Sequence, residues 1–189
     1  MIAALGADRS VHLTDEALAG SDVAATGYAL AQVLTNESPD LVLLGQQSDD
    51  GECYTIGAVV ADHLKMPSLT QVIKIDVAEG KLTCERQAEY GYDTVEVETP
   101  AVISVGDAIN EPRYPSLKAI MGAKKKPLDA KTTGDVGIDA SKVGGDGSAV
   151  SCGDFKAPPQ KAGGTIIEDE DTNETVEKIV AWLDERKLI

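Results

Sequence analysis

A polar loop between an apolar run and a helical pattern carries residue types that could hold a ligand. Residues 40–45 form an apolar run ending in glycine, residues 46–55 are polar, and a helical pattern begins near residue 57. In open α/β sheets ligands bind beyond the carboxyl ends of strands, and the first N–H groups of the next helix could receive a phosphate. Acidic side chains in the loop would repel that phosphate, so N–H groups and the hydroxyls of Ser48 and Thr55 would have to hold it. Neither a GxGxxG nor a Walker A pattern is present, so an ordinary polar loop stays the alternative.

Other reactive side chains offer weaker possibilities. The acids at positions 49, 50 and 52 could bind a hard metal ion, but their spacing matches no regular ligand pattern, so a solvated loop is favoured. Cys53 is either a small packing residue or a functional thiol. His12 and His63 have no Ser, Cys or Asp partner at motif spacing, and no nucleophile elbow occurs. The sequence therefore predicts no catalytic residue and no enzyme activity of its own.

A second group of residues forms the basic segment, residues 110–127, with the sequence NEPRYPSLKAIMGAKKKP. Together with Lys131 it carries six of the 17 basic residues, in a chain whose net charge is −15. Prolines at 112 and 115 restrict the backbone around Tyr114 and lower the entropy cost of ordering it. Apolar side chains at 117, 120 and 121 follow at helical spacing. The segment is either a docking surface or a helix that faces the core and has solvated lysines. Nucleic-acid binding is disfavoured, because one short lysine run gives a small footprint.

Composition limits the class of protein. The chain has 189 residues and is 42% apolar, enough for one domain with a real core. Its acids are spread along the whole chain, which favours adaptation to high salt over an acidic binding patch. The cysteines at 53, 84 and 152 are far apart, so a disulfide framework or zinc site is not expected and reduced cytoplasmic thiols fit. No apolar run approaches the roughly 18 residues that span a bilayer.

The expected order of strands and helices is typical of an α/β fold. Gly6 closes a short helical turn at 1–5, and Ser21 is the expected N-cap of the first long helix. A strand over 40–45 should be buried on both faces. The other expected elements are strands at 10–14, 71–77, 81–87, 94–98 and 100–105, helices at 21–35 and 57–64, and a closing helix N-capped by Asn173. Residues 128–164 read as an extended arm.

Several stretches of the chain together resemble one known family. They are GADR at 6–9, DLVLLGQQS at 40–48, DG at 50–51, CER at 84–86, PAV at 100–102, NEPRY at 110–114 with the lysines at 124–126, and GDVG at 134–137. In this order they resemble the beta subunit of electron transfer flavoproteins, and the likeness covers essentially the whole chain. The resemblance implies an α/β fold of the adenine nucleotide alpha hydrolase type, which is Rossmann-like, without hydrolase activity. The residue patterns themselves predict a mainly parallel sheet with a small antiparallel β-meander over residues 71–98, and an extended C-terminal arm that ends in a helix.

The resemblance also implies cofactors and partners. The family forms a heterodimer with an alpha subunit, which holds most of one FAD. This FAD takes electrons from acyl-CoA dehydrogenases and related flavin dehydrogenases, as in fatty acid beta-oxidation, and passes them to a membrane quinone oxidoreductase. The beta subunit binds a structural AMP, or a second FAD in electron-bifurcating members. We therefore expect a cytoplasmic protein, from a salt-adapted source, without nucleic acid and without direct membrane insertion.

Site residues follow by position from this resemblance. The AMP loop falls on Gly45, Gln47, Ser48, Asp50, Gly51, Glu52, Cys53, Thr55 and Ile56. The docking residues are Arg113, Tyr114, Leu117, Ile120 and Met121, with Leu117 as the anchor. The family begins with a strand–helix–strand segment that has no counterpart here, so we expect this polypeptide alone to bind AMP weakly or not at all.

The expected domain organisation has two parts. Residues 1–127 form a nucleotide-binding α/β domain, incomplete at its N-terminus, with the recognition loop at 110–127. Residues 128–189 form an arm and a helix that pack on the alpha subunit. The competing binding-module hypothesis is a nucleotide-sensing domain of the universal-stress type. The competing enzyme hypothesis, an ATP pyrophosphatase, would need an SGGxDS-type loop that the sequence does not contain.

Overall fold

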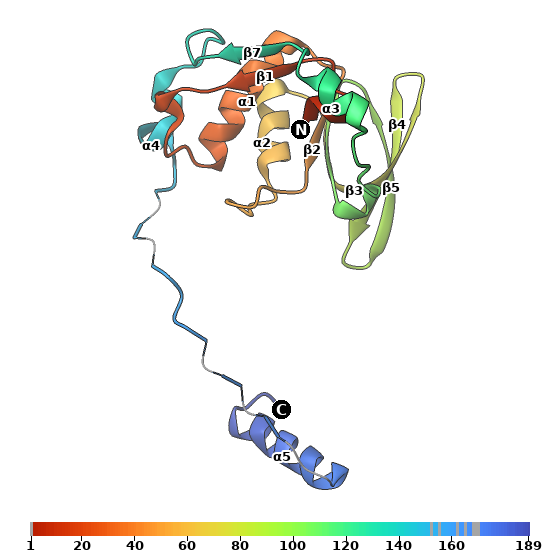
Figure 1. Cartoon of the computed structure of the whole chain (residues 1–189), viewed down its shortest axis with the longest axis vertical. Helices are drawn as coiled ribbons and strands as arrows, with labels where there is room; N and C mark the ends of the chain where they lie inside the picture. The colour runs from red at the N-terminus through yellow and green to blue at the C-terminus, as the bar shows by residue number, and fades with distance from the viewer. Residues whose placement is uncertain (1, 152, 155, 162, 165, 168–170) are drawn as a thin grey trace. The chain divides into compact units, whose positions relative to one another are not determined.

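A five-stranded sheet is the centre of the computed structural model, which describes residues 2–151, 153–154, 156–161, 163–164, 166–167 and 171–189. Its strand order is β2 (Leu41–Gly45), β6 (Ala101–Val105), β3 (Ser68–Ala78), β4 (Lys81–Ala88) and β5 (Gly91–Glu98). Strands β2, β6 and β3 are parallel. Strands β3, β4 and β5, labelled in Figure 1, form an antiparallel meander. The predicted α/β fold class with its meander is confirmed.

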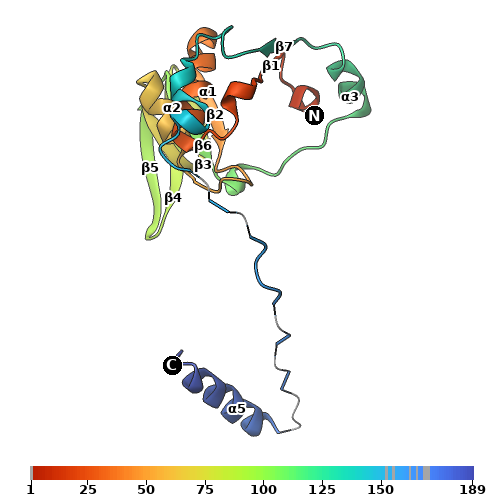
Figure 2. The same ribbon diagram turned by 90° about the vertical axis from the view of Figure 1, so that its left-hand side faces the viewer.

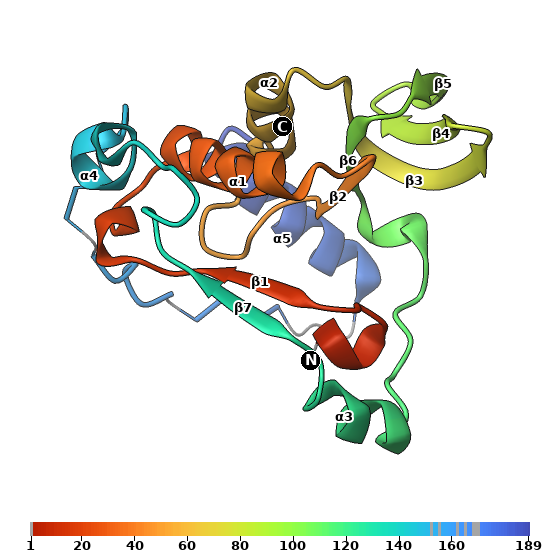
Figure 3. The same ribbon diagram turned by 90° about the horizontal axis from the view of Figure 1, so that it is seen from above.

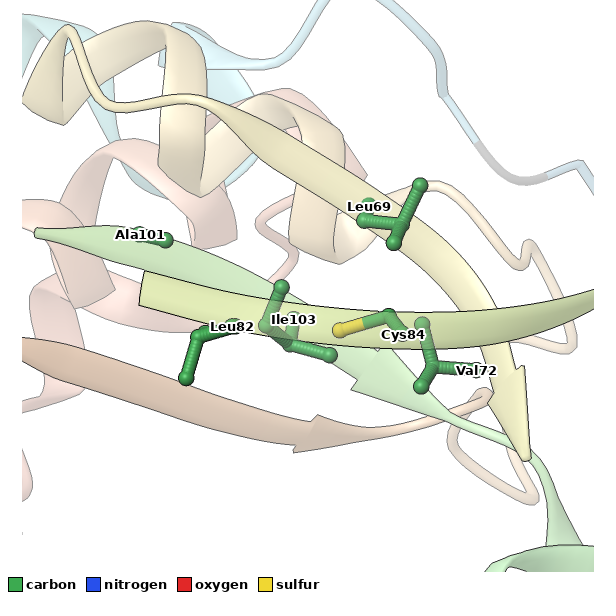
Figure 4. Close-up of a cluster of buried hydrophobic side chains, with 6 residues drawn as sticks. All are labelled: Leu69, Val72, Leu82, Cys84, Ala101 and Ile103. Carbon is green, nitrogen blue, oxygen red and sulfur yellow. The ribbon is translucent and has the colours of Figure 1, made fainter. Parts of the chain in front are cut away.

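The core of the sheet lies along β6 and the strands beside it. Ala101, Val102 and Ile103 of β6 are fully buried. Side chains of β3 and β4 that point to one face of the sheet pack against Ala101 and Ile103 of β6. Figure 4 shows this cluster, which consists of Leu69, Val72, Leu82, Cys84, Ala101 and Ile103. Burial raises the pKa of the Cys84 thiol, which keeps it protonated and unreactive.

Strand β2 differs from the sequence expectation. It was expected to be buried on both faces, but it lies at one edge of the sheet. Val42 packs with Ala61 and Val102, whereas Leu43, on the opposite face, is 58% exposed. An apolar run alone does not say whether a strand is central or at an edge, because that depends on which strands pair with it.

Two helices pack closely on each other beside the parallel strands. They are α1 (Val23–Glu37) and α2 (Ile56–Leu64). A Cβ atom at Gly27 of α1 would lie 2.5 Å from Val59 Cγ1, so glycine permits this close approach. The N-cap of α1 is Asp22, not the expected Ser21: its carboxylate accepts the Ala25 N–H at 2.9 Å.

Residues 128–151 fold with the first unit and are not the expected extended arm. Strand β7 (Leu128–Lys131) pairs in parallel with β1 (Ser10–Leu13), as Figure 3 shows. Beyond it, Val136, Ile138 and Val143 are buried against Ala29 of α1. Short turns η4 (Ala140–Lys142) and α4 (Gly144–Gly147) complete this segment. The chain accordingly divides into Met1–Ser151 and Cys152–Ile189, since apolar contacts continue past residue 127.

The remaining elements of the first unit are short. They are the 3-10 turns η1 (Ile2–Leu5), η2 (Glu16–Leu18) and η3 (Asp107–Ile109), and helix α3 (Leu117–Ala123). Figure 2 shows α3 on a long excursion of the chain, away from the five-stranded sheet. None of its residues is buried.

The second unit contains helix α5 (Thr172–Glu185). Its N-cap is Asp171, whose carboxylate accepts the Asn173 N–H at 2.8 Å, so the expected Asn173 cap is wrong by two positions. Its apolar stripe is exposed and comprises Val176, Ile179, Val180 and Trp182. In the described ranges no helix is both long and apolar enough to cross a membrane. Cys152 lies outside the described residues.

Candidate functional site

The polar loop of residues 46–55 leaves the carboxyl end of β2 and leads into α2, as the sequence predicts. Gly57 of α2 lies close to β6: a Cβ atom there would be 3.4 Å from Ser104 Cβ. At Gly45, by contrast, a Cβ atom would meet nothing within 4 Å. The loop therefore occupies the position at which open α/β sheets bind ligands.

The loop is a compact turn that bonds to itself. The Glu52 N–H donates to the Ser48 carbonyl at 3.0 Å, and the Gly51 N–H donates to Ser48 Oγ at 3.4 Å. The Cys53 thiol donates to the Gly51 carbonyl at 2.9 Å. Glu52 and Tyr54 have φ angles of +44° and +56°, which non-glycine residues adopt at a cost. Such strain gathers where a loop has to present particular groups.

The charge in the loop is negative. The Ser48 hydroxyl, followed by the N–H groups of Asp50 itself and of Gly51, holds the pKa of the Asp50 carboxyl below its usual value. Asp50 is therefore ionised at neutral pH. Among the described residues, no group of three or more His, Cys, Asp or Glu side chains is arranged to hold a metal ion. An anion at this loop would have to be held against the local charge.

Helix α2 offers the donors that such an anion needs. Thr55 is the N-cap residue, but its side chain makes no capping hydrogen bond. The first N–H groups bonded within the helix are those of Ala58 and Val59, which donate to the Thr55 carbonyl at 3.0 and 3.1 Å. The earlier N–H groups of Ile56 and Gly57 have no partner inside the helix. Together with the dipole of a nine-residue helix, they form a place for a phosphate oxygen.

A polar pocket of about 340 Å³ adjoins the loop. Half of its lining residues are glutamines, and the lining comprises Gln46, Gln47, Tyr54, Gln71, Ile73, Gln87, Gly106 and Asp107. The side-chain oxygen of Gln47 is buried and has no hydrogen-bond partner among the described residues. Buried polar atoms are normally paired, so this loop is in a conformation that a bound ligand could complete.

The pocket and the expected AMP residues overlap only in part. Gln47 alone of the nine expected positions lines the pocket. Gln71 and Gln87 come from β3 and β4, where sequence reasoning saw only strand residues. Gln71 sits at a shift of the β3 register, with φ +57°. No local pattern marks these glutamines, because strand pairing and this bulge bring them to the loop.

The basic segment places most of its expected docking residues in solvent. Tyr114 is 95% exposed, and the α3 side chains Leu117, Ile120 and Met121 are 75%, 44% and 62% exposed. Ser116 caps the helix by accepting the Ala119 N–H at 3.2 Å. These apolar side chains do not face the core, which was the alternative interpretation. Arg113 differs from them, since its guanidinium donates to the Leu5 carbonyl.

The two histidines lie in regular elements of the first unit. His63 lies in the last turn of α2 and makes an edge-on ring contact with Tyr28, with ring centroids 5.5 Å apart. His12 lies in β1 and pairs with Ala130 of β7.

Comparison with known proteins shows what the chain is similar to. The Electron transfer flavoprotein domain family matches residues 1–135. The electron transfer flavoprotein subunit beta of Mycobacterium bovis is 42% identical over 188 residues, which make up 98% of this chain and 69% of that protein. The same subunit of Mycobacterium leprae is 43% identical over 188 residues, with the same coverage. The caffeyl-CoA reductase-Etf complex subunit CarD of Acetobacterium woodii is 34% identical over 187 residues, 98% of this chain and 71% of that protein.

Proposed function

The chain belongs to the electron transfer flavoprotein family as a beta subunit, and from this membership we propose how it works. It joins an alpha subunit that holds most of one FAD, and it presents the complex to flavin dehydrogenases such as acyl-CoA dehydrogenases. Electrons then pass to a membrane quinone oxidoreductase. FAD supplies the electron-transfer chemistry when bound, whereas this chain supplies binding surfaces and no catalytic residue. With its net charge of −15, we propose that it acts in a salt-rich cytoplasm.

The exposed face of α3 is the observation that carries the docking role. Leu117 is 75% exposed, at the first position of a helix that follows two prolines. Burying a whole leucine side chain is worth about 1.5–3 kcal/mol. Covering the exposed three quarters would therefore contribute about 1–2 kcal/mol, or about 5- to 30-fold in affinity. A rigid, apolar anchor of this kind is typical of interface hot spots.

The docking role is tested in the complex. The chain is co-expressed with an electron transfer flavoprotein alpha subunit, and a yellow heterodimer is expected. Replacing Leu117 with Ala should slow electron transfer from a flavin dehydrogenase about 5- to 30-fold at limiting concentration, with flavin content unchanged. Val77→Ala is the matched control, because Val77 is 70% exposed on β3.

Two results would contradict this role. Loss of flavin from the Leu117→Ala complex would mean that α3 faces the alpha subunit instead of a dehydrogenase. A chain that self-associates, binds nucleotide and takes up no flavin-bearing partner would instead favour the nucleotide-sensing domain of the universal-stress type.

We propose further that the polar loop holds a structural AMP. The uncapped start of α2 and the hydroxyls of Ser48 and Thr55 would receive its phosphate, and the unpartnered Gln47 oxygen fits a loop completed by a ligand. Flavin and AMP released from the heterodimer by denaturation should then be equimolar. Two flavins and no AMP per heterodimer would assign a second FAD to this loop. Thr55→Val should lower the AMP content of the complex, and Thr70→Val, on β3, is the control.

A further inference from the structure

Two cations on either side of helix α3 donate to backbone carbonyls near the start of the chain: Lys126, which is half-buried, and Arg113, which is exposed. The Lys126 ammonium donates to the Ala3 carbonyl at 3.0 Å and to the Ala7 carbonyl at 2.5 Å. The Arg113 guanidinium donates to the Leu5 carbonyl. Arg113 precedes α3 and Lys126 follows it, so both ends of the excursion are tied to the same short stretch, residues 3–7.

The carbonyls of that stretch need such donors. The Ala3 and Leu5 carbonyls belong to the 3-10 turn η1 and the Ala7 carbonyl lies just beyond it, and the last carbonyl groups of a helical turn lack partners within it. The negative end of a helical turn also favours cations. Gly6, at φ +134°, turns the chain at this point, and a Cβ atom there would lie 3.3 Å from the Arg113 guanidinium.

The other lysines of the basic segment behave differently. Lys118, Lys124 and Lys125 are exposed, and the ammonium group of each makes no hydrogen bond or ion pair with another described residue. Lys126 is half-buried. The run of three lysines is therefore divided: its last member holds the chain, and the first two face solvent.

Apart from its own contact with η1, helix α3 has little else to hold it. Figures 2 and 3 show it beside η1 and the end of the β1–β7 pair, away from the five-stranded sheet. No residue of the helix is buried. A helix of seven residues is not stable alone, so its direction depends on what fixes its two ends.

We propose that Arg113 and Lys126 are positioning residues, which fix α3 on the η1 turn so that Leu117 and Met121 point outward in one defined direction. The inference rests on the docking role proposed above. Without these bonds the segment is free before docking, and the partner has to order it on binding, which weakens association. The chemistry of electron transfer is left unchanged.

The experiment uses the heterodimer with Lys126→Met, which keeps the long apolar stem and removes the charge. Lys125→Met is the matched control, and Lys126→Arg tests rescue. In Lys126→Met, amide hydrogen exchange over residues 117–126 is expected to be at least tenfold faster, while exchange in β6 stays unchanged. With a flavin dehydrogenase, KM for the heterodimer should rise several-fold and kcat should stay within twofold. Lys125→Met should leave exchange unchanged, and Lys126→Arg should restore protection.

The outcomes separate the two proposals. Unchanged exchange over residues 117–126 in Lys126→Met would overturn the positioning role, whatever happens to electron transfer. Faster exchange throughout Met1–Ser151 would also overturn it, since Lys126 would then support the whole unit. If exchange rises only over 117–126 while Leu117→Ala leaves electron transfer intact, positioning holds and the docking role fails.

Discussion

Gly144 provides a sharp test of how residues 132–151 pack against the rest of the first unit. It begins α4 with φ +70°, and a Cβ atom there would lie 2.6 Å from the Ala17 carbonyl oxygen and 3.4 Å from that of Ala19. Both neighbours are backbone atoms, which cannot move aside as a side-chain end does. Gly144→Ala therefore forces either α4 or the η2 region to shift.

The cost of Gly144→Ala has two parts. A non-glycine residue in left-handed backbone costs about 1–2 kcal/mol. An extra methyl group in a packed site costs about 1–3 kcal/mol. After a gain of up to about 1 kcal/mol for replacing glycine in a helix, the free energy of unfolding should fall by about 1–5 kcal/mol. With an m-value of about 2 kcal/mol per molar urea, the midpoint should fall by about 0.5–2.5 M.

Urea denaturation followed by circular dichroism measures this difference. Gly145→Ala is the matched control, because a Cβ atom there meets nothing within 4 Å. The Gly145 N–H keeps its hydrogen bond to the Ala19 carbonyl, 3.1 Å long. If both variants unfold at the same urea concentration as the unmodified chain, residues 132–151 do not pack against η2 as described.

Acid should loosen the same segment. Hydrogen bonds from Thr133 lower the pKa of Asp15, and a hydrogen bond from the Ala25 N–H is the largest cause of the lowered pKa of Asp22. The stability that these two ionised carboxylates contribute is therefore complete above the usual pKa of 3.8. It is lost as the pH falls through their lower pKa in the folded protein. Lowering the pH from 7 to 3 should therefore reduce the urea midpoint less in the double variant Asp15→Asn, Asp22→Asn than in the unmodified chain. An equal reduction of the midpoint in both chains would refute this reasoning. On α5, we expect the exposed apolar stripe to pack on the alpha subunit, so Ile179→Asp should weaken co-purification of the two subunits. The control Glu177→Asp should leave co-purification unchanged. Full recovery of the heterodimer with Ile179→Asp would exclude a contact between this stripe and the alpha subunit.

Much of the fold is local and could be read from the sequence. Period-two alternation marked the meander strands, and the meander itself needs only turns of a few residues between neighbours. Helix α2, strand β6 and the polar loop between β2 and α2 follow from local patterns as well. The N-caps were off by one or two positions, because Ser, Asp and Asn side chains close together compete for the same N–H groups.

The chain's own sequence therefore determined the α/β class, the polar loop between β2 and α2 and the motif of the basic segment. Only the tertiary structure decided what pairs across long separations. Ser10 pairs with Leu128, and this pairing makes residues 128–131 a strand instead of an arm. In the same way, Gln71 and Gln87 reach the polar loop, and Lys126 turns away from Lys124 and Lys125 toward the carbonyls of residues 3 and 7. Local periodicity reports which face of an element is apolar, whereas partners more than a hundred residues away are chosen by packing the whole unit.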